Sequence, residues 1–400
     1  MQDIVCVSHL RWDFVRQRPQ HLLSRLAKDY RITFVEEPFI STQFRHPYLE
    51  ILKRDDFSNP ITVVRLIYPA RQNGWIGHGD ARTQPTYGRL LKPFFQRNGI
   101  VDPILWFYTP MGYDFKQILR PSLMVYDVMD QLSAFKDAPT PLRAFDESLL
   151  KEADLVFTGG ISLYRDKLPH NPNTYLFPSG IEIRHFAQAA DPDTLPCPQD
   201  IAHLKSPILG YFGVVDERMD LQLLEKMAIA HPEWNIVIIG PVVKISHDDL
   251  PKAPNLYYLG MKAYAELPAY LARFDVALIP FARNEATRFI SPTKTLEYMA
   301  ARKPIVSTAI DDVIELYGMV VSVGWTHEEF IHRCKTALDE LKNPPAPKIC
   351  EERRLIEDAY LLQNTLDNAD WRMNTLIQKE LQAETAPAES AFQKPIAANA

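Results

Sequence analysis

The chain has 400 residues, 46% of them hydrophobic and 24% charged, which is the composition of a soluble globular protein with room for two domains. Its formal net charge of −6 provides no overall basic field, so the composition argues against a nucleic-acid partner. The four cysteines contain no CxxC pair, which argues against a disulfide framework or a zinc site and favours the reduced cytoplasm.

The sequence carries no targeting or membrane-spanning pattern. It begins directly with the strand-like run DIVCVSHL (3–10), without the basic region and apolar core of a signal peptide. No uninterrupted apolar stretch approaches the ~20 residues of a membrane-spanning helix. We therefore expect a cytoplasmic protein and leave peripheral contact with the inner face of the membrane open.

Short apolar runs alternate with helical patterns in the first half, which predicts βα units around a mainly parallel sheet. Strands are expected at residues 4–8, 32–36, 61–66, 104–108, 123–128, 155–158 and 174–177, and helices at 20–28 and 143–152. This pattern predicts a first Rossmann-like domain, on the acceptor side, over residues 1–186.

A basic cluster formed by Arg11, Arg16 and Arg18 follows the first predicted strand. In a doubly wound domain this position faces the cleft, where such residues can hold an anionic acceptor or a donor diphosphate. The alternative is a solvated basic start of the next helix. The charge is concentrated before the helix and not spread along it, which favours binding.

The run SLMVYDVMD (122–130) places Asp127 and Asp130 at the end of another predicted strand. Carboxylates at strand ends in a cleft are candidates for a catalytic base or for orienting a hydroxyl. A helix N-cap is the alternative role for Asp130. The pair resembles half of a metal site, but the sequence offers no third ligand, so we expect no metal.

A Pro-, Asp- and Ala-rich segment, residues 187–206, is expected to link two domains. In the second domain, residues 207–350, strands are expected at 208–212, 235–239, 256–259, 276–280, 305–308 and 319–323, and helices at 221–230, 265–272, 293–301 and 328–341. Residues 351–382 are expected to be helical, with Trp371 and Met373 as anchors. The tail, 383–400, is expected to be disordered.

Gly210 and Gly213 bracket the end of the first strand of the second domain, where glycine lets a ligand approach the backbone closely. Arg218 follows in the loop and is expected to contact a phosphate; a solvated arginine near a turn is the alternative. No GxGxxG follows the first strand of the chain, and the chain has only 15 glycines, which argues against a dinucleotide-dependent oxidoreductase.

Residues 281–308 predict a loop that leads into an anion-binding helix. Ser291 is expected to cap this helix, and Pro292 suits its first position. Thr293 and Lys294 follow; a lysine in the first turn opposes the helix dipole but would stabilise a bound phosphate. Glu297 lies one turn further on, where a carboxylate can accept hydrogen bonds from sugar hydroxyls. The alternative is a surface helix whose Lys294 pairs with a nearby acid.

Together these segments resemble the family 4 and family 1 glycosyltransferases, which are retaining sugar transferases of the GT-B fold. The resemblance covers roughly residues 3–380. It rests on the order of the following runs: ADLVFTGGISLYRDKL (153–168), YLFPSGIEIRHF (175–186), ILGYFG (208–213), NIVIIGP (235–241), NLYYLG (255–260), FDVALIPF (274–281) and LEYMAARKPIVST (296–308). It implies two doubly wound α/β domains that face a central cleft, with the last helix returning to the first domain.

The resemblance also implies a function. It implies retaining hexosyl transfer from a nucleoside diphosphate sugar, with UDP favoured, to a glycan or lipid-linked acceptor in cell-surface polysaccharide synthesis, without a metal or other cofactor. Glu297 would bind the donor ribose, and the base would lie near residues 258–261. The diphosphate would meet Gly213, Arg218, Ser291, Thr293 and Lys294. Asp127 or Asp130 would stand on the first-domain wall of the catalytic site.

The chain departs from the family pattern at three places. Phe289 stands eight residues before Glu297, where the family has its first motif glutamate, and a short insertion would return Glu285 to that place at the sugar. RQRPQH (16–21) replaces the glycine-rich loop of the first domain, and Arg218 alone replaces a basic pair. Two other hypotheses therefore stay open: a nucleotide-sugar epimerase of GT-B architecture and a non-catalytic GT-B-like binding subunit.

Overall fold

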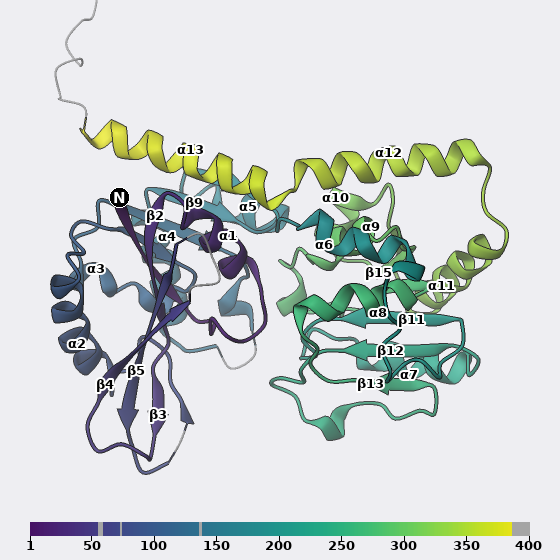
Figure 1. Ribbon diagram of the computed structural model, residues 1–400, viewed down its shortest axis with the longest axis horizontal. Helices are drawn as coiled ribbons and strands as arrows, with labels where there is room; N and C mark the ends of the chain where they lie inside the picture. The colour runs from purple at the N-terminus through teal and green to yellow at the C-terminus, as the bar shows by residue number, and fades with distance from the viewer. Residues whose placement is uncertain (55–58, 73, 136–137, 386–400) are drawn as a thin grey trace, which may run out of the picture.

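The computed structural model describes residues 1–54, 59–72, 74–135 and 138–385. Within them the chain forms two α/β domains side by side, and two long C-terminal helices run along one side of both domains (Figure 1). This arrangement confirms the predicted fold class. The tail that the sequence predicts to be disordered lies, from residue 386 on, outside the described residues.

The sheet of the first domain has the strand order β10-β9-β8-β7-β1-β2-β5-β3-β6, with β4 also paired to β5. Its predicted strands are all present and parallel: β1 (Gln2–Ser8), β2 (Tyr30–Glu36), β5 (Ile61–Pro69), β7 (Ile104–Phe107), β8 (Leu123–Val128), β9 (Leu155–Thr158) and β10 (Thr174–Leu176). Alternate residues of β1 serve two cores: Ile4 and Cys6 pack on one face, and Val5 and Val7 pack on the other. Burial on both faces explains why these strands are continuous apolar runs.

The sequence did not reveal a small extension of this sheet. β3 (Phe39–Ser41) and β6 (Gly74–Trp75) pair antiparallel, and β4 (Tyr48–Arg54) pairs antiparallel with β5. No residue of β4 is fully buried, so the strand lacks the apolar run of a central strand. The helices of this domain are α1 (Arg18–Leu26), α2 (Gln84–Arg97), α3 (Phe115–Ile118), α4 (Leu142–Glu152) and α5 (Ile161–Lys167). α2 was missed because Pro93 lies inside it, where proline normally breaks a helix.

The sheet of the second domain is parallel throughout, in the order β13-β12-β11-β14-β15-β16. Its strands are β11 (Ile208–Phe212), β12 (Asn235–Ile239), β13 (Leu256–Tyr258), β14 (Val276–Ile279), β15 (Ile305–Thr308) and β16 (Ser322–Gly324). Its helices are α7 (Leu221–Ala230), α8 (Leu267–Arg273), α9 (Lys294–Ala300), α10 (Asp311–Tyr317) and α11 (His327–Lys342). β16 begins later than the predicted residue 319, because Val320 and Val321 still donate hydrogen bonds to the Tyr317 carbonyl oxygen at the end of α10.

The segment expected to link the domains packs firmly against the second domain. α6 (Ile183–Ala187) contacts α9, and Phe186, Ala189 and Ile201 are buried in the core of the second domain. The chain therefore passes from the first domain to the second near Ile181. There the Ile181 amide donates to the Asn364 carbonyl oxygen at 2.9 Å, so the two chain connections between the domains are hydrogen-bonded to each other.

The C-terminal helices divide their packing between the domains (Figure 1). α12 (Pro347–Gln363) contacts α9, whereas α13 (Leu366–Thr385) contacts α1. Met373 is fully buried in the first-domain core, as expected of an anchor. Trp371 is not an anchor, because it is 68% exposed on the opposite face of α13. In the described part of the chain, none of the helices combines the length and apolar character needed to cross a membrane.

Candidate active site

A cleft lies between the two domains, at the carboxyl ends of their parallel strands. Its lining comes from the loop after β1, the end of β8, residues 179–182, and the loops after β11, β13 and β14. The cavity measures about 1180 Å³ with its open mouth included. The cleft is therefore open to solvent and lined by residues of both domains.

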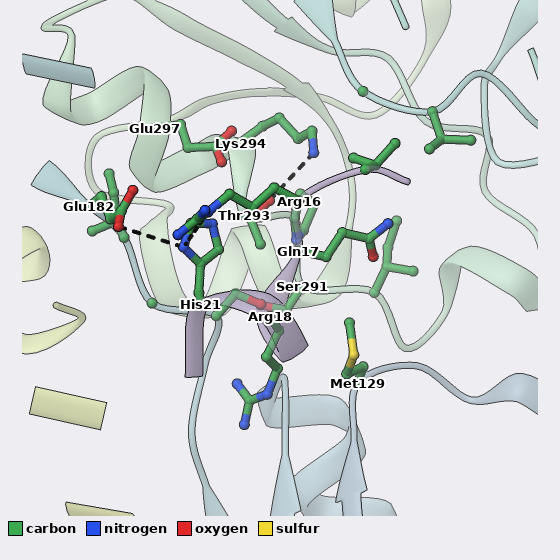
Figure 2. A pocket seen from close by; sticks show the side chains of 18 of the residues that line it. Arg16, Gln17, Arg18, His21, Met129, Glu182, Ser291, Thr293, Lys294 and Glu297 are labelled. Atoms are coloured by element: carbon green, nitrogen blue, oxygen red, sulfur yellow. Dashed lines mark hydrogen bonds and ion pairs between the residues drawn. The ribbon is translucent and has the colours of Figure 1, made fainter. Parts of the chain in front are cut away.

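The helix α9 begins two residues later than a cap at Ser291 predicts. It starts at Lys294 with Thr293 at its N-cap, and Ser291 and Pro292 precede it. Ser291 is thus not the cap; its hydroxyl lies against Asp312 of α10, to which it is hydrogen-bonded. The Nζ atom of Lys294 lies 3.5 Å from the Thr293 hydroxyl (Figure 2), and no carboxylate of the described residues forms an ion pair with it. The alternative of a lysine that simply pairs with an acid does not hold there.

Glu297 follows Lys294 by one turn and lines the same cleft. One of its carboxylate oxygens is buried and has no hydrogen-bond partner in the described part of the protein. Burial raises the pKa of Glu297, and the nearby charge of Lys294 opposes that rise only in part. A buried carboxylate oxygen without a partner is costly, so this oxygen is suited to accept a hydrogen bond from a ligand hydroxyl.

Gly213 allows the strand end of β11 to meet α9. Its φ is +151°, and a Cβ atom there would lie 2.7 Å from the Lys294 Cε atom and 2.5 Å from the Tyr211 hydroxyl. Gly240, at the end of β12, has a φ of +143°, and its Cβ would lie 1.8 Å from the Gly213 carbonyl oxygen. Side chains at these two positions would displace the backbone that forms the floor of the cleft.

Arg218 lines the cleft in a fixed orientation. Its Nε and Nη2 atoms donate to the two carboxylate oxygens of Asp216, at 2.9 and 2.7 Å. Burial opposes the charge of Arg218, but the hydrogen bonds to Asp216 and the negative charge of Asp130 outweigh it and raise the pKa of the guanidinium. Arg218 is therefore a permanent cation whose position is set by a two-point contact.

The side chains of the three arginines after β1 lie in different environments. Arg11 pairs with Glu36 at 3.2 Å and donates to the Pro38 carbonyl oxygen at 3.0 Å, outside the cleft lining. Arg18 points away from the other labelled side chains (Figure 2), and its Nη2 lies 3.0 Å from an Asp127 carboxylate oxygen. Arg16 reaches across the cleft and lies over the Tyr264 ring of the second domain, 5.7 Å from its centroid. Arg16 and Arg18 thus both line the cleft, whereas Arg11 does not.

The two aspartates at the end of β8 also differ. Asp127 is fully buried and does not line the cleft, so the structure contradicts its role as a catalytic acid or base. Burial raises the pKa of Asp127, although its ion pair with Arg18 opposes that rise. Asp130 lines the cleft near Arg218. It is the better-placed of the two to orient an acceptor hydroxyl.

Sequence reasoning missed a set of contacts that joins the domains beside the cleft. The Tyr264 hydroxyl of the second domain donates to Glu182 at 3.1 Å. Glu182 also lies 3.8 Å from His21 and 3.5 Å from Arg25 of α1, and Figure 2 shows its contact with His21. The contact with His21, helped by Arg16 and Arg25, outweighs partial burial and lowers the pKa of Glu182 to about 2. These contacts join segments that are far apart in the sequence, so no local motif predicts them.

Comparison with known proteins agrees with this geometry. Residues 206–340 match the family model of the glycosyl transferases group 1. The matched residues span most of the second domain, which is therefore similar to this family. The resemblance predicted from the motifs is thereby confirmed.

A curated relative and several solved structures extend the comparison. The chain is 26% identical over 201 residues to the putative teichuronic acid biosynthesis glycosyltransferase TuaH of Bacillus subtilis; the match covers 48% of this chain and 47% of TuaH, or about half the length of that relative. The sucrose-phosphate synthase of Thermosynechococcus elongatus superposes with a TM-score of 0.69 at 14% identity, over 96% of this chain and 100% of that one. HepE of Anabaena, solved in complex with UDP and glucose, superposes with a TM-score of 0.64 at 14% identity, over 94% and 100%. The two structures establish that this chain has the GT-B fold.

One departure from the family pattern has a structural explanation. Phe289, which stands where the family has its first motif glutamate, packs against the hydrophobic core of the first domain. Glu285 lies on a 3-10 turn (Glu285–Thr287), is exposed, and does not line the cleft. The structure therefore does not bring Glu285 to the sugar, and the position of the missing glutamate is used for contact between the domains.

Proposed function

We propose that this chain is a glycosyltransferase that moves a hexosyl group from a nucleoside diphosphate sugar, with UDP favoured, to a glycan or lipid-linked acceptor. The observation that carries the proposal is the buried carboxylate oxygen of Glu297, which lacks a partner in the described part of the chain, one turn beyond the unpaired Lys294. An acceptor for ribose hydroxyls and a cation for phosphate thus lie one turn apart on one short helix. The name of the relative TuaH supports a setting in polysaccharide synthesis.

The mechanism follows from the charges that face the cleft. When the bond between the sugar and the diphosphate breaks, negative charge grows on the leaving diphosphate. Lys294 and Arg218 are fixed cations beside that position, and Arg16 adds a third from the other domain. Preorganised charges of this kind stabilise the transition state without rearranging. We propose that they do so without a metal ion, and that Asp130 orients the acceptor hydroxyl.

We further propose transfer with retention of configuration. The support for this proposal is the match of residues 206–340 to the glycosyl transferases group 1, together with the resemblance of the sequence motifs to retaining transferases. Product analysis by nuclear magnetic resonance, which distinguishes the two anomers, would test this. The same analysis separates a transferase from an epimerase, which would change the donor sugar with no acceptor present.

Calorimetric titration with UDP, GDP and ADP tests the donor site directly. We expect one nucleotide to bind, and Glu297→Ala to weaken it by roughly 10- to 150-fold, the value of a hydrogen bond to a charged group. The melting temperature should not fall, because the variant removes a buried, unpartnered carboxylate. Glu285→Ala, which changes an exposed glutamate outside the cleft, is the matched control. Failure of all three nucleotides to bind the folded protein would contradict the proposal and favour a non-catalytic subunit.

A further inference from the structure

The loop after β1 is anchored firmly on both sides of a short tip. Trp12 is buried against Phe34, with 5.0 Å between the ring centroids, and its amide donates to Glu36 at 2.7 Å. Asp13 forms an ion pair with Arg54 of β4. On the other side of the tip, Gln20 of α1 donates to the Val15 carbonyl oxygen at 3.3 Å. The tip, residues 14–16, is therefore held in a defined place although it belongs to a loop.

Phe14, at this tip, is 44% exposed. It lines a second hollow, which joins the main cleft at Lys294 and Glu297 because both residues line the two cavities. The opposite wall of this hollow comes from the second domain. Its apolar members include Phe212, Ile239, Pro241, Met261 and Leu267.

Phe14 and Met261 approach the hollow from different domains, and both are substantially exposed, Met261 by 51%. Exposed apolar side chains that share one hollow mark a surface that a ligand covers. Among the described lining residues that the hollow does not share with the main cleft, Lys262 is the only polar side chain, and it is paired with Asp200 at 2.7 Å. Such a lining suits a flat aromatic group better than a sugar, whose hydroxyls require hydrogen-bond partners.

The position of the hollow identifies the group. In the proposed function, on which this inference rests, the diphosphate lies at Lys294 and the ribose at Glu297. The hollow shares these two residues with the main cleft and continues to Met261, so a nucleotide held at Lys294 and Glu297 can place its base there. We infer that Phe14 stacks on the nucleobase of the donor, so that the first domain closes the base pocket of the second.

The test measures nucleotide affinity in Phe14→Ala and Phe14→Trp, by calorimetry with whichever of UDP, GDP and ADP binds the unaltered protein. Stacking predicts that Phe14→Ala weakens this nucleotide by about 5- to 150-fold and that Phe14→Trp keeps or improves the affinity. Inorganic pyrophosphate, which lacks a base, should bind Phe14→Ala as it binds the unaltered protein. Lys294→Ala should weaken both ligands.

Phe44→Ala is the matched control. Phe44 is 43% exposed, also in the first domain, but packs edge-on against Tyr48 at 5.0 Å and does not line the hollow. It should leave nucleotide affinity unchanged. Equal affinity of Phe14→Ala and the unaltered protein would overturn the inference while the proposed function stands, and so would an equal loss for pyrophosphate, which would indicate a displaced loop. If no nucleotide binds the unaltered protein, the proposed function itself fails.

Discussion

The two walls of the cleft both carry charged residues at strand ends, but they use them differently. On the second-domain wall, Lys294 has no ion pair and Glu297 has an oxygen without a hydrogen bond in the described residues. On the first-domain wall, Arg18 and Asp127 neutralise each other in the interior. The contrast is thus between a buried ion pair in the first domain and two groups of the second domain, Lys294 and Glu297, that remain available to a ligand.

Charged residues near a cleft can therefore have either of two roles, one in stability and one in ligand binding. A buried pair holds a wall in shape, whereas a charge left without a partner marks the place of the chemistry. Variants that break the buried pair should therefore change stability, and variants of Lys294 and Glu297 should change binding and turnover.

Asp127→Ala should have the largest effect. It leaves the Arg18 guanidinium buried without its partner, so we expect the free energy of unfolding to fall by about 3–5 kcal/mol. Urea denaturation followed by circular dichroism measures this change. Asp130→Ala, three residues further on, should change the free energy of unfolding by no more than about 0.5 kcal/mol, the usual range for substitutions outside the core.

The double variant Arg18→Leu/Asp127→Leu sharpens the first prediction. It removes both charges, so most of the lost stability should return, because two apolar side chains bury without a desolvation penalty. A double variant as unstable as Asp127→Ala would indicate that the pair contributes through its hydrogen bonds and not through its charges.

Lys294→Ala should lower kcat by a larger factor than it lowers donor affinity. The lysine acts mainly on charge that develops as the diphosphate leaves, so kcat should fall by roughly 10²–10³-fold, a value typical for loss of one preorganised donor. Steady-state kinetics with the matching nucleotide sugar measures this effect. Lys226→Ala, on α7 and paired with Glu328 at 3.6 Å, should leave kcat unchanged. A normal kcat for Lys294→Ala would remove this residue from the mechanism.

Glu182→Gln should have the smallest effect, and one that depends on pH. The pKa of Glu182 is about 2 in the folded protein but ~4.3 in an unfolded chain. Its carboxylate therefore stabilises the fold above the unfolded pKa. The shift corresponds to about 3 kcal/mol, and solvent screening of this partly exposed group reduces the contribution to about 2 kcal/mol, which is lost as pH falls toward 2. Unfolding at pH 7 and pH 3 should reveal a stability gap between the variant and the unaltered protein that narrows in acid. A gap that is constant with pH would assign the effect to packing.

Much of the fold is legible in the sequence because its determinants are local. Parallel strands buried on both faces are continuous apolar runs, as in residues 235–239 and 276–279. Elements without that signature were missed: the half-exposed β4, and α2 with its internal proline. Trp371 was wrongly predicted to be an anchor, because the presence of a hydrophobic residue on a helix does not show which face of the helix packs against the domain.

The candidate site likewise has features that the sequence predicts and features that only the tertiary structure reveals. The sequence alone determined that Lys294 and Glu297 lie one helical turn apart and that Gly213 ends a strand, because these relations depend on neighbouring residues. Tertiary structure decided which charges remain available. The Arg18–Asp127 pair joins residues 109 positions apart, and Phe14 and Met261 meet in one hollow from two domains. Pairing and burial depend on how distant elements pack, and no local pattern encodes that packing.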